Sequence, residues 1–183
     1  MTAAAPALAE LTALDRYVAA PDPSYRYETI ETLRGNGYTA HVIELTSQRW
    51  RDAAEVDRPR WKHWLTVIVP ERIATDAALL VIGGGSNEGK PPARVASLLA
   101  VAALTTGSVT AELRMVPNQP LTFAGETETR AEDGIIAYSW DKYLRTGDDC
   151  WPLRLPMTKS VVRAMDAITG STSRASRPLL RSL

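Results

Sequence analysis

The chain alternates between short apolar runs and segments whose apolar residues recur at helical spacing. Ala77 to Ile82 is apolar throughout, which is typical of a strand covered on both faces in a parallel sheet, and we expect an interior strand here. Trp64 to Val69 predicts a second apolar strand, closed by Pro70. Tyr38 to Thr46 mixes polar and apolar positions as early strands do, and Ser108 to Val116 predicts a further strand.

Three helices are predicted after the apolar strands. The first ends at Gly107 and the second at Gly147, because glycine readily takes the left-handed conformation that closes a helix. The predicted apolar faces are Val95, Leu98, Leu99, Ala102 and Ala103 in the first helix, Ile136, Trp140, Tyr143 and Leu144 in the second, and Val161, Met165 and Ile168 in the third.

Strands and helices in this order predict an α/β fold, with an open, mostly parallel sheet that has early antiparallel strands and carries helices on both faces. Ligands of such sheets lie beyond the carboxyl ends of the strands. Gly83, Gly84 and Gly85 follow the Ala77 to Ile82 strand at that edge, where glycines can take positive φ angles and expose their backbone amides. The next residues include Pro91 and Pro92, which suit the first turn of the following helix.

Polar residues at the same edge complete the candidate site. Ser86 and Asn87 lie within the glycine turn. Asn118 and Gln119 follow the next strand, and they are either ligand contacts or turn residues that satisfy their own backbone. A turn of this kind supports phosphate binding or the stabilisation of an oxyanion.

Nucleotide binding is the weaker of these two interpretations. The pattern Gly84-x-x-x-x-Gly89-Lys90 matches the first part of a P-loop. Pro91 stands where a P-loop has the serine or threonine that holds Mg²⁺, and no later apolar strand ends in the aspartate that would complete a metal site. We therefore expect neither a cofactor nor a metal ion.

The segment Arg58 to Trp64 interleaves cationic side chains with two indoles, a combination that can stack on and neutralise a single nucleic-acid strand. The 21 basic and 21 acidic residues of the chain balance, so no overall field attracts nucleic acid. Cationic stems packed over Trp61 and Trp64 at a sheet edge explain the segment more simply. No nucleic-acid partner is expected.

Composition is that of an ordinary soluble domain, with 45% apolar and 23% charged residues in 183. No apolar run approaches the roughly 20 residues that cross a bilayer, so no membrane span is expected. Cys150 is the single cysteine, which excludes an internal disulfide, and we expect a buried thiol.

Hydrolytic catalysis requires a nucleophile, a base and an orienting acid. His41 and His63 are the only histidines, and both lie in early strands, so we expect structural roles for them. The Gly-x-Ser-x-Gly elbow is absent, because Ser86 is followed by Asn87 and Glu88. No triad can be assembled, and no catalytic residue is assigned.

Several separated motifs nevertheless occur in one order, at residues 14–25, 46–50, 57–64, 83–90, 112–120 and 151–159. With them the chain resembles the PhoPQ-activated pathogenicity-related protein family over about Leu14 to Ile168. The resemblance implies an α/β-hydrolase-like fold in a much longer chain, whose elbow serine, acid and histidine lie beyond residue 183. It also implies that Gly83 to Gly85 take the place of the oxyanion loop. Because the nucleophile is missing, this N-terminal portion is expected to be catalytically inactive.

The same family implies a bacterial, virulence-associated protein that is often exported, with an undefined substrate. Ala3 to Ala9 is similar to the cleavage end of a signal peptide, but no complete signal peptide is present, so the location stays open. We divide the chain into residues 1–13, an alanine-rich leader or flexible N-terminus; 14–169, the hydrolase-like part; and 170–183, a tail rich in serine and arginine that is flexible or aberrant.

Two partners follow from these expectations. If the elbow strand is missing, the strands at Ala77 to Ile82 and Ser108 to Val116 leave an open apolar sheet edge through which copies of the chain can associate. The alternative is a small self-contained α/β domain that binds an unidentified small molecule or peptide through the turn from Gly83 to Lys90.

Overall fold

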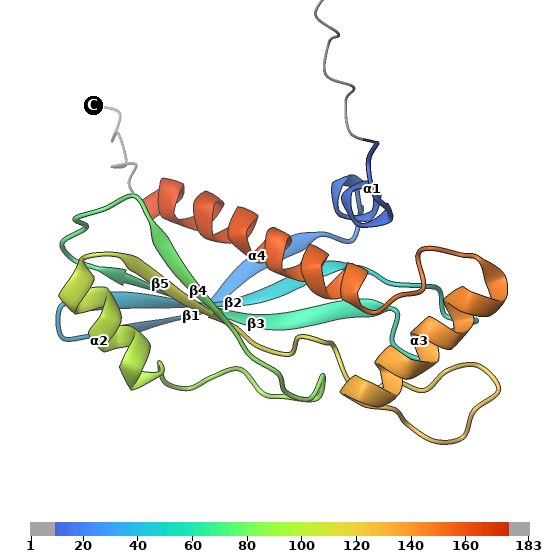
Figure 1. The fold of residues 1–183 in the computed structure, drawn as a ribbon. Coiled ribbons are helices and arrows are strands. Elements are labelled where there is room, and N and C mark those ends of the chain that lie inside the picture. Colours follow the sequence, from blue (N-terminus) through green and yellow to red (C-terminus); the bar gives the residue numbers. More distant parts are fainter. Residues whose placement is uncertain (1–9, 176–183) are drawn as a thin grey trace, which may run out of the picture.

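The computed structural model describes residues 10–175, with side chains up to residue 172, and contains one five-stranded sheet and four helices (Figure 1). In chain order the elements are α1 (Ala13–Ala19), β1 (Arg26–Gly35), β2 (Tyr38–Arg49), β3 (Arg60–Pro70), β4 (Ala78–Ile82), α2 (Ser97–Thr106), β5 (Val109–Leu113), α3 (Glu132–Thr146) and α4 (Arg154–Ala175). The mixed α/β character predicted from the sequence is confirmed.

The sheet has the order β1-β2-β3-β5-β4, and its pairing corrects two expectations. Three of the four strand pairs are antiparallel, and only β4 and β5 run parallel, so the sheet is not mostly parallel. β4 is also an edge strand and not an interior one: Leu79, Val81 and Ile82 are 48%, 40% and 51% exposed. Its apolar run indicates contact on both faces, but the described residues cover it only in part.

Helices lie on both faces of the sheet, as predicted, because the strands alternate their side chains between the faces. Ile43 and Leu45 of β2 pack with Ala164 and Ala167 of α4 on one face. On the other face α2 packs its Leu99 and Ala103 against Ala40 and Ile68. Figure 1 shows α4 running along one side of the strands and α2 along the other.

The predicted helix faces are only partly right. In α2, Leu99 and Ala103 are buried, but Leu98 is 79% exposed, because this helix is apolar on nearly all sides and its pattern does not select a face. Leu144 of α3 is 77% exposed, and Met165 of α4 is 54% exposed. The small residues Ser139, Ala164 and Ala167 are buried in their place, since they allow closer approach to the core. Both predicted stops, Gly107 and Gly147, close their helices in the left-handed conformation.

Two boundaries differ from the expected ones. α2 begins at Ser97, five residues after Pro92, so the two prolines lie in a loop and not in the first helical turn. α4 continues through Gly170 to Ala175, so the first residues of the expected tail are helical, and its residues 176–183 lie outside the described part. The expected leader, residues 1–13, lies outside it up to residue 9, and Thr12 then caps α1 through Asp15.

A second core of aromatic residues lies beyond the sheet, between the ends of β2 and β3 and helix α3. Trp50 is its centre, with T-shaped contacts to Trp61, Phe123 and Trp151 at ring-centroid distances of 5.8, 6.2 and 6.3 Å. Its Nε1–H donates to the Cys150 carbonyl at 3.1 Å. This cluster attaches the segment after β5, which contains α3, to the strands.

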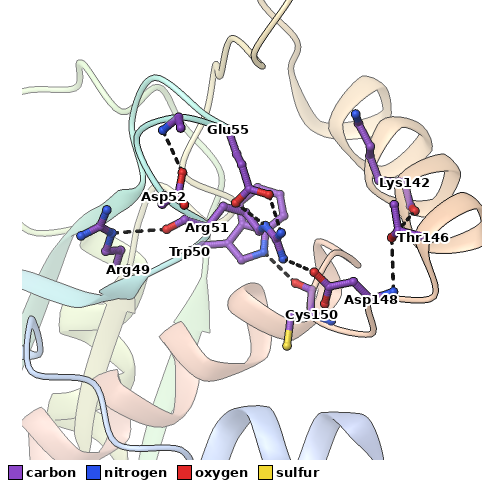
Figure 2. Close-up of polar contacts among 10 residues, drawn as sticks. Arg49, Trp50, Arg51, Asp52, Glu55, Lys142, Thr146, Asp148 and Cys150 are labelled. Carbon is purple, nitrogen blue, oxygen red and sulfur yellow. Dashed lines mark hydrogen bonds and ion pairs between the residues drawn. The ribbon is translucent and has the colours of Figure 1, made fainter.

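Arg51 fastens the same region from outside, and Figure 2 shows its guanidinium between Glu55 and Asp148. The three residues form ion pairs of 2.6 and 2.8 Å, and the guanidinium also lies 4.0 Å from the Trp151 ring centroid. Arg51 has a left-handed φ of 62°, which costs a non-glycine residue about 1 kcal/mol or more. The partly buried ion pairs and the indole contact offset this strain and hold the turn after β2 against the loop between α3 and α4.

Cys150 lies in this region and is exposed, which corrects the expected buried thiol. Partial burial, with Asp148 and Asp149 nearby, raises the pKa of its thiol, so the thiol is less reactive than an ordinary one. Ligand atoms of these three residues lie within 4.8 Å of one another. Asp148 of this cluster already pairs with Arg51.

Candidate functional site

The glycine turn leaves the carboxyl end of β4 and extends its pairing with the segment after β5. The Gly83 N–H donates to the Leu113 carbonyl at 2.8 Å. The carbonyls of Gly84 and Gly83 in turn accept from the amides of Met115 and Val116 at 3.0 and 3.2 Å. These bonds fix the turn beside its neighbour, as expected for the carboxyl edge of two parallel strands.

Within the described part of the chain, no hydrogen bond uses the amides of Gly84 and Gly85 as donors. Both residues are exposed, so these two N–H groups are available to an oxygen atom of a ligand. Gly85 has a φ of 130°, which only glycine adopts easily, so this geometry depends on the residue type predicted for it. Exposed backbone amides without a partner are the groups from which anion and oxyanion sites are made.

Asn87 fastens the turn instead of facing a ligand. Its Nδ2–H donates to the Pro120 carbonyl at 2.8 Å, and its Oδ1 accepts from Arg58 at 2.6 Å. Arg58 also forms a 2.7 Å ion pair with Glu88. Ser86, next to it, is exposed, and its Oγ accepts from the Glu88 amide at 3.2 Å.

The structure places Asn118 and Gln119 beside the turn, in the roles of backbone partners. Asn118 is buried, and its Nδ2–H donates to the Lys62 carbonyl of β3 at 2.6 Å. The Gln119 side chain accepts from the Glu132 amide at the start of α3, and its carbonyl accepts from Asn87. Of the seven candidates, the two amides of Gly84 and Gly85 are the groups best placed to meet a ligand.

The P-loop interpretation fails on geometry. In a P-loop the lysine opens a helix whose N-terminal amides bind phosphate. Lys90 instead precedes a loop, and α2 begins only at Ser97. The nucleic-acid interpretation fails similarly, because Trp61 is fully buried and the Trp64 Nε1–H donates to the Gly89 carbonyl. β3 is a central strand and not the sheet edge assumed for these indoles.

A buried polar network lies between β2, β3 and α4, and sequence reasoning missed it. The His63 Nε2 lies 2.9 Å from the Ser47 Oγ, and that hydroxyl lies 2.9 Å from the Ser160 Oγ of α4. The Gln48 side chain donates to the Ser160 hydroxyl and accepts from Tyr17 of α1. The signal for it is the run of three consecutive polar residues, Thr46 to Gln48, near the end of β2, all of which are buried.

The geometry sets the tautomer of His63. Its Nδ1 faces the carbonyls of Met115 and Arg114 at 3.1 and 3.3 Å, and carbonyls only accept, so Nδ1 carries the proton. Nε2 is then an acceptor for the Ser47 hydroxyl. Burial lowers the pKa of His63 to about 4, with the two carbonyls acting in the opposite direction.

Although a serine bonded to a histidine suggests catalysis, this pair has no access to substrate. Ser47 is 0% exposed and His63 is 1% exposed. The partners of Nδ1 are carbonyls and not a carboxylate, so the orienting acid of a catalytic triad is missing at this histidine. The pair joins β2, β3 and α4, which is the structural role expected for His63. His41 lies in β2, as expected, half-buried beside Thr32.

The fold and this edge define a mixed α/β protein with a glycine turn at the carboxyl ends of its two parallel strands. The chain belongs to the PhoPQ-activated pathogenicity-related protein family, whose model matches residues 14–178. The resemblance seen in the sequence is therefore confirmed.

Two comparisons add to this assignment. The chain is 40% identical over 159 residues to autocrine proliferation repressor protein A of Dictyostelium discoideum, a match that covers 86% of this chain and 32% of the relative. The chain therefore spans about a third of that relative's length. It is also similar to the structure of a glucuronoyl esterase from Solibacter usitatus, with a TM-score of 0.35 and 18% identity over 75% of this chain and 47% of the esterase. A structural likeness this slight carries no inference.

The relative also bears on the expected source. Because a Dictyostelium protein carries the same family features, membership does not show a bacterial or virulence-associated protein. Over residues 10–175, no helix has both the length and the apolar character that a bilayer span needs.

Proposed function

We propose that this chain forms the first part of an α/β-hydrolase-like domain and that its glycine turn supplies amides to an oxyanion-type site. The observation that supports the proposal is the pair of exposed, unbonded amides of Gly84 and Gly85 at the carboxyl edge. Two amides that converge on one oxygen stabilise the negative charge that develops during acyl transfer. The Dictyostelium relative is named as a repressor of proliferation and not as a hydrolase, so we carry over only the shared family.

On this proposal the 183-residue chain has no hydrolytic activity by itself. Its buried serine and histidine, Ser47 and His63, cannot reach an ester, and the exposed Ser86 bonds with no histidine. We expect p-nitrophenyl acetate to be hydrolysed at the buffer rate, measured by nitrophenolate absorbance. A saturable rate that falls on Ser86→Ala or Ser47→Ala would contradict the proposal.

A second function, ligand binding by a self-contained domain, is favoured by the same exposed amides. Gly84→Val tests whether the turn binds a ligand. A Cβ at Gly84 meets no atom within 4 Å, so the fold should tolerate this variant. If the turn binds ligands, any compound found by a fluorescence-based thermal screen should lose at least tenfold in affinity in this variant. Gly125→Val is a matched control, since a Cβ there also meets nothing within 4 Å, although its φ of 82° adds strain. Equal ligand affinity in both variants would exclude the glycine turn as the binding site.

Self-association through the edge of β4 stays a proposal. Of the two strands expected to leave an open edge, β5 is covered by β3 and β4, and Ala78–Ile82 lies at the edge, where the exposed Leu79, Val81 and Ile82 make it apolar. Sedimentation that depends on concentration, and that Val81→Lys abolishes, would support this partner; a monomer at every concentration would oppose it.

A further inference from the structure

Two arginines lie opposite each other at the ends of β2 and β3, near the glycine turn. Arg49 and Arg60 are paired residues in the strand register. Opposed like charges on neighbouring strands repel each other and destabilise a sheet. Both side chains are exposed, and within residues 10–175 neither forms an ion pair with an acid.

The neighbouring cations differ from these two. Arg58 is neutralised by Glu88 at 2.7 Å, and it also lies 3.8 Å from Asp57. Lys62 pairs with Glu44 across the strands at 2.9 Å. Of these four neighbouring cations, Arg49 and Arg60 are therefore the two whose charge is not neutralised by an acid of the described residues.

These side chains line a hollow. A cavity of about 510 Å³ is bounded by the ends of β2 and β3, the loop between them and the glycine turn. Because successive side chains of a strand point to opposite faces, Arg60 and Lys62 share one face of β3, and Arg49 lies beside Arg60 on that face. The lining residues are Arg49, Ala53, Asp57, Arg58, Pro59, Arg60, Lys62, Asn87 and Asn118.

The only acid in this lining is Asp57, against four cations. Among residues 10–175, the Arg49 side chain makes one polar contact, a 3.3 Å bond from Nε to the Arg51 carbonyl, so its terminal nitrogens have no partner there. A guanidinium presents donors in a planar fork that matches two oxygens of one anionic group. The pair is therefore arranged to hold such a group from two sides.

We propose that this cavity binds an anionic small molecule, with Arg49 and Arg60 together holding a carboxylate or a phosphate group. The anion replaces the repulsion between the guanidiniums with attraction to both. The proposal goes beyond the oxyanion role of the glycine turn and does not rest on it, because its residues belong to β2 and β3 and binding is measured directly.

The test is a titration of the ¹⁵N-labelled 183-residue chain, followed by NMR. Citrate and inorganic phosphate are added separately, with sodium chloride at matched ionic strength as a reference, so that the two arms show which group is preferred. We expect saturable shifts of the Arg49 and Arg60 Nε–H signals, while those of Arg34 and Arg72 stay in place. Chloride alone should give no saturable shift.

Variants give the second readout. The double variant Arg49→Gln/Arg60→Gln should lower the affinity for the preferred anion at least tenfold. In the charge-matched control Arg34→Gln/Arg72→Gln the affinity should stay within twofold of the parent value. Both control side chains are exposed and form no ion pair within the described residues. Without anion and at low salt, Arg60→Gln should melt at a higher temperature than the parent chain. Shifts that never saturate, or equal losses in both double variants, would overturn the site. Either outcome leaves the glycine-turn proposal standing, because its tests use other residues.

Discussion

Replacing Trp50 by alanine is expected to lower the free energy of unfolding by about 3 to 5 kcal/mol. The side chain is fully buried and touches three other aromatic rings, so its removal leaves a cavity between rigid neighbours that cannot close it. The carbonyl of Cys150 also loses its donor. Urea unfolding followed by circular dichroism measures the change, and a typical domain has only about 5 to 15 kcal/mol to lose.

Trp140→Ala is the control for this prediction. This indole is 44% exposed on α3, and its ring contacts that of Tyr143, so a loss well below that of Trp50→Ala is expected. Similar losses for both indoles would show that the aromatic cluster does not hold the α3 region. Loss of Trp50 should also release the turn after β2, because Trp151 supports both Trp50 and Arg51.

The strands and helix ends could be predicted because they rest on local rules. Local polar and apolar patterns predicted four of the five strands, and Gly107 and Gly147 end their helices through the left-handed conformation available to glycine. The polar strand β1 was missed, because most of its residues are exposed and its pattern contains no buried face. Direction in a sheet is not local: β3 and β5 pair antiparallel, and nothing in either segment encodes this.

The glycines indicate a candidate site, which stays a prediction, but the sequence does not assign roles to its residues. A triple glycine indicates exposed amides, and Gly84 and Gly85 have them. Whether an asparagine faces a ligand or a backbone carbonyl depends on neighbours distant in sequence, such as Lys62 for Asn118. The opposed pair of Arg49 and Arg60 requires the register of two strands, which a one-residue bulge after Thr46 shifts.

The second large effect is a loss of stability on mild acidification, and it originates at His63. The folded pKa of this imidazole is lowered to about 4 from 6.5 in the unfolded chain, because burial disfavours the charged form. Below pH 6.5 the unfolded state therefore binds a proton that the folded state refuses, so stability is complete above pH 6.5 and falls as the pH approaches 4. Between pH 7 and pH 4.5 the expected loss is about 2 to 3 kcal/mol.

Few other groups obscure this window. The carboxyls of Asp22, Asp148 and Glu126 have lowered pKa values, so their contributions disappear only at more acidic pH. His41 has a pKa lowered by partial burial and adds a smaller loss of the same sign. As the pH falls, the stability of the parent chain should thus fall mainly because burial keeps the imidazole of His63 neutral in the folded state.

Two variants assign the effect. His63→Gln should be less stable than the parent chain at pH 7, but its urea midpoint should change little between pH 7 and pH 4.5, because the group that titrates is gone. His41→Gln should keep most of the parent's dependence. If His63→Gln retained the full acid sensitivity, the proton would bind elsewhere, and the buried network of β2, β3 and α4 would not be the part of the fold that acid opens first.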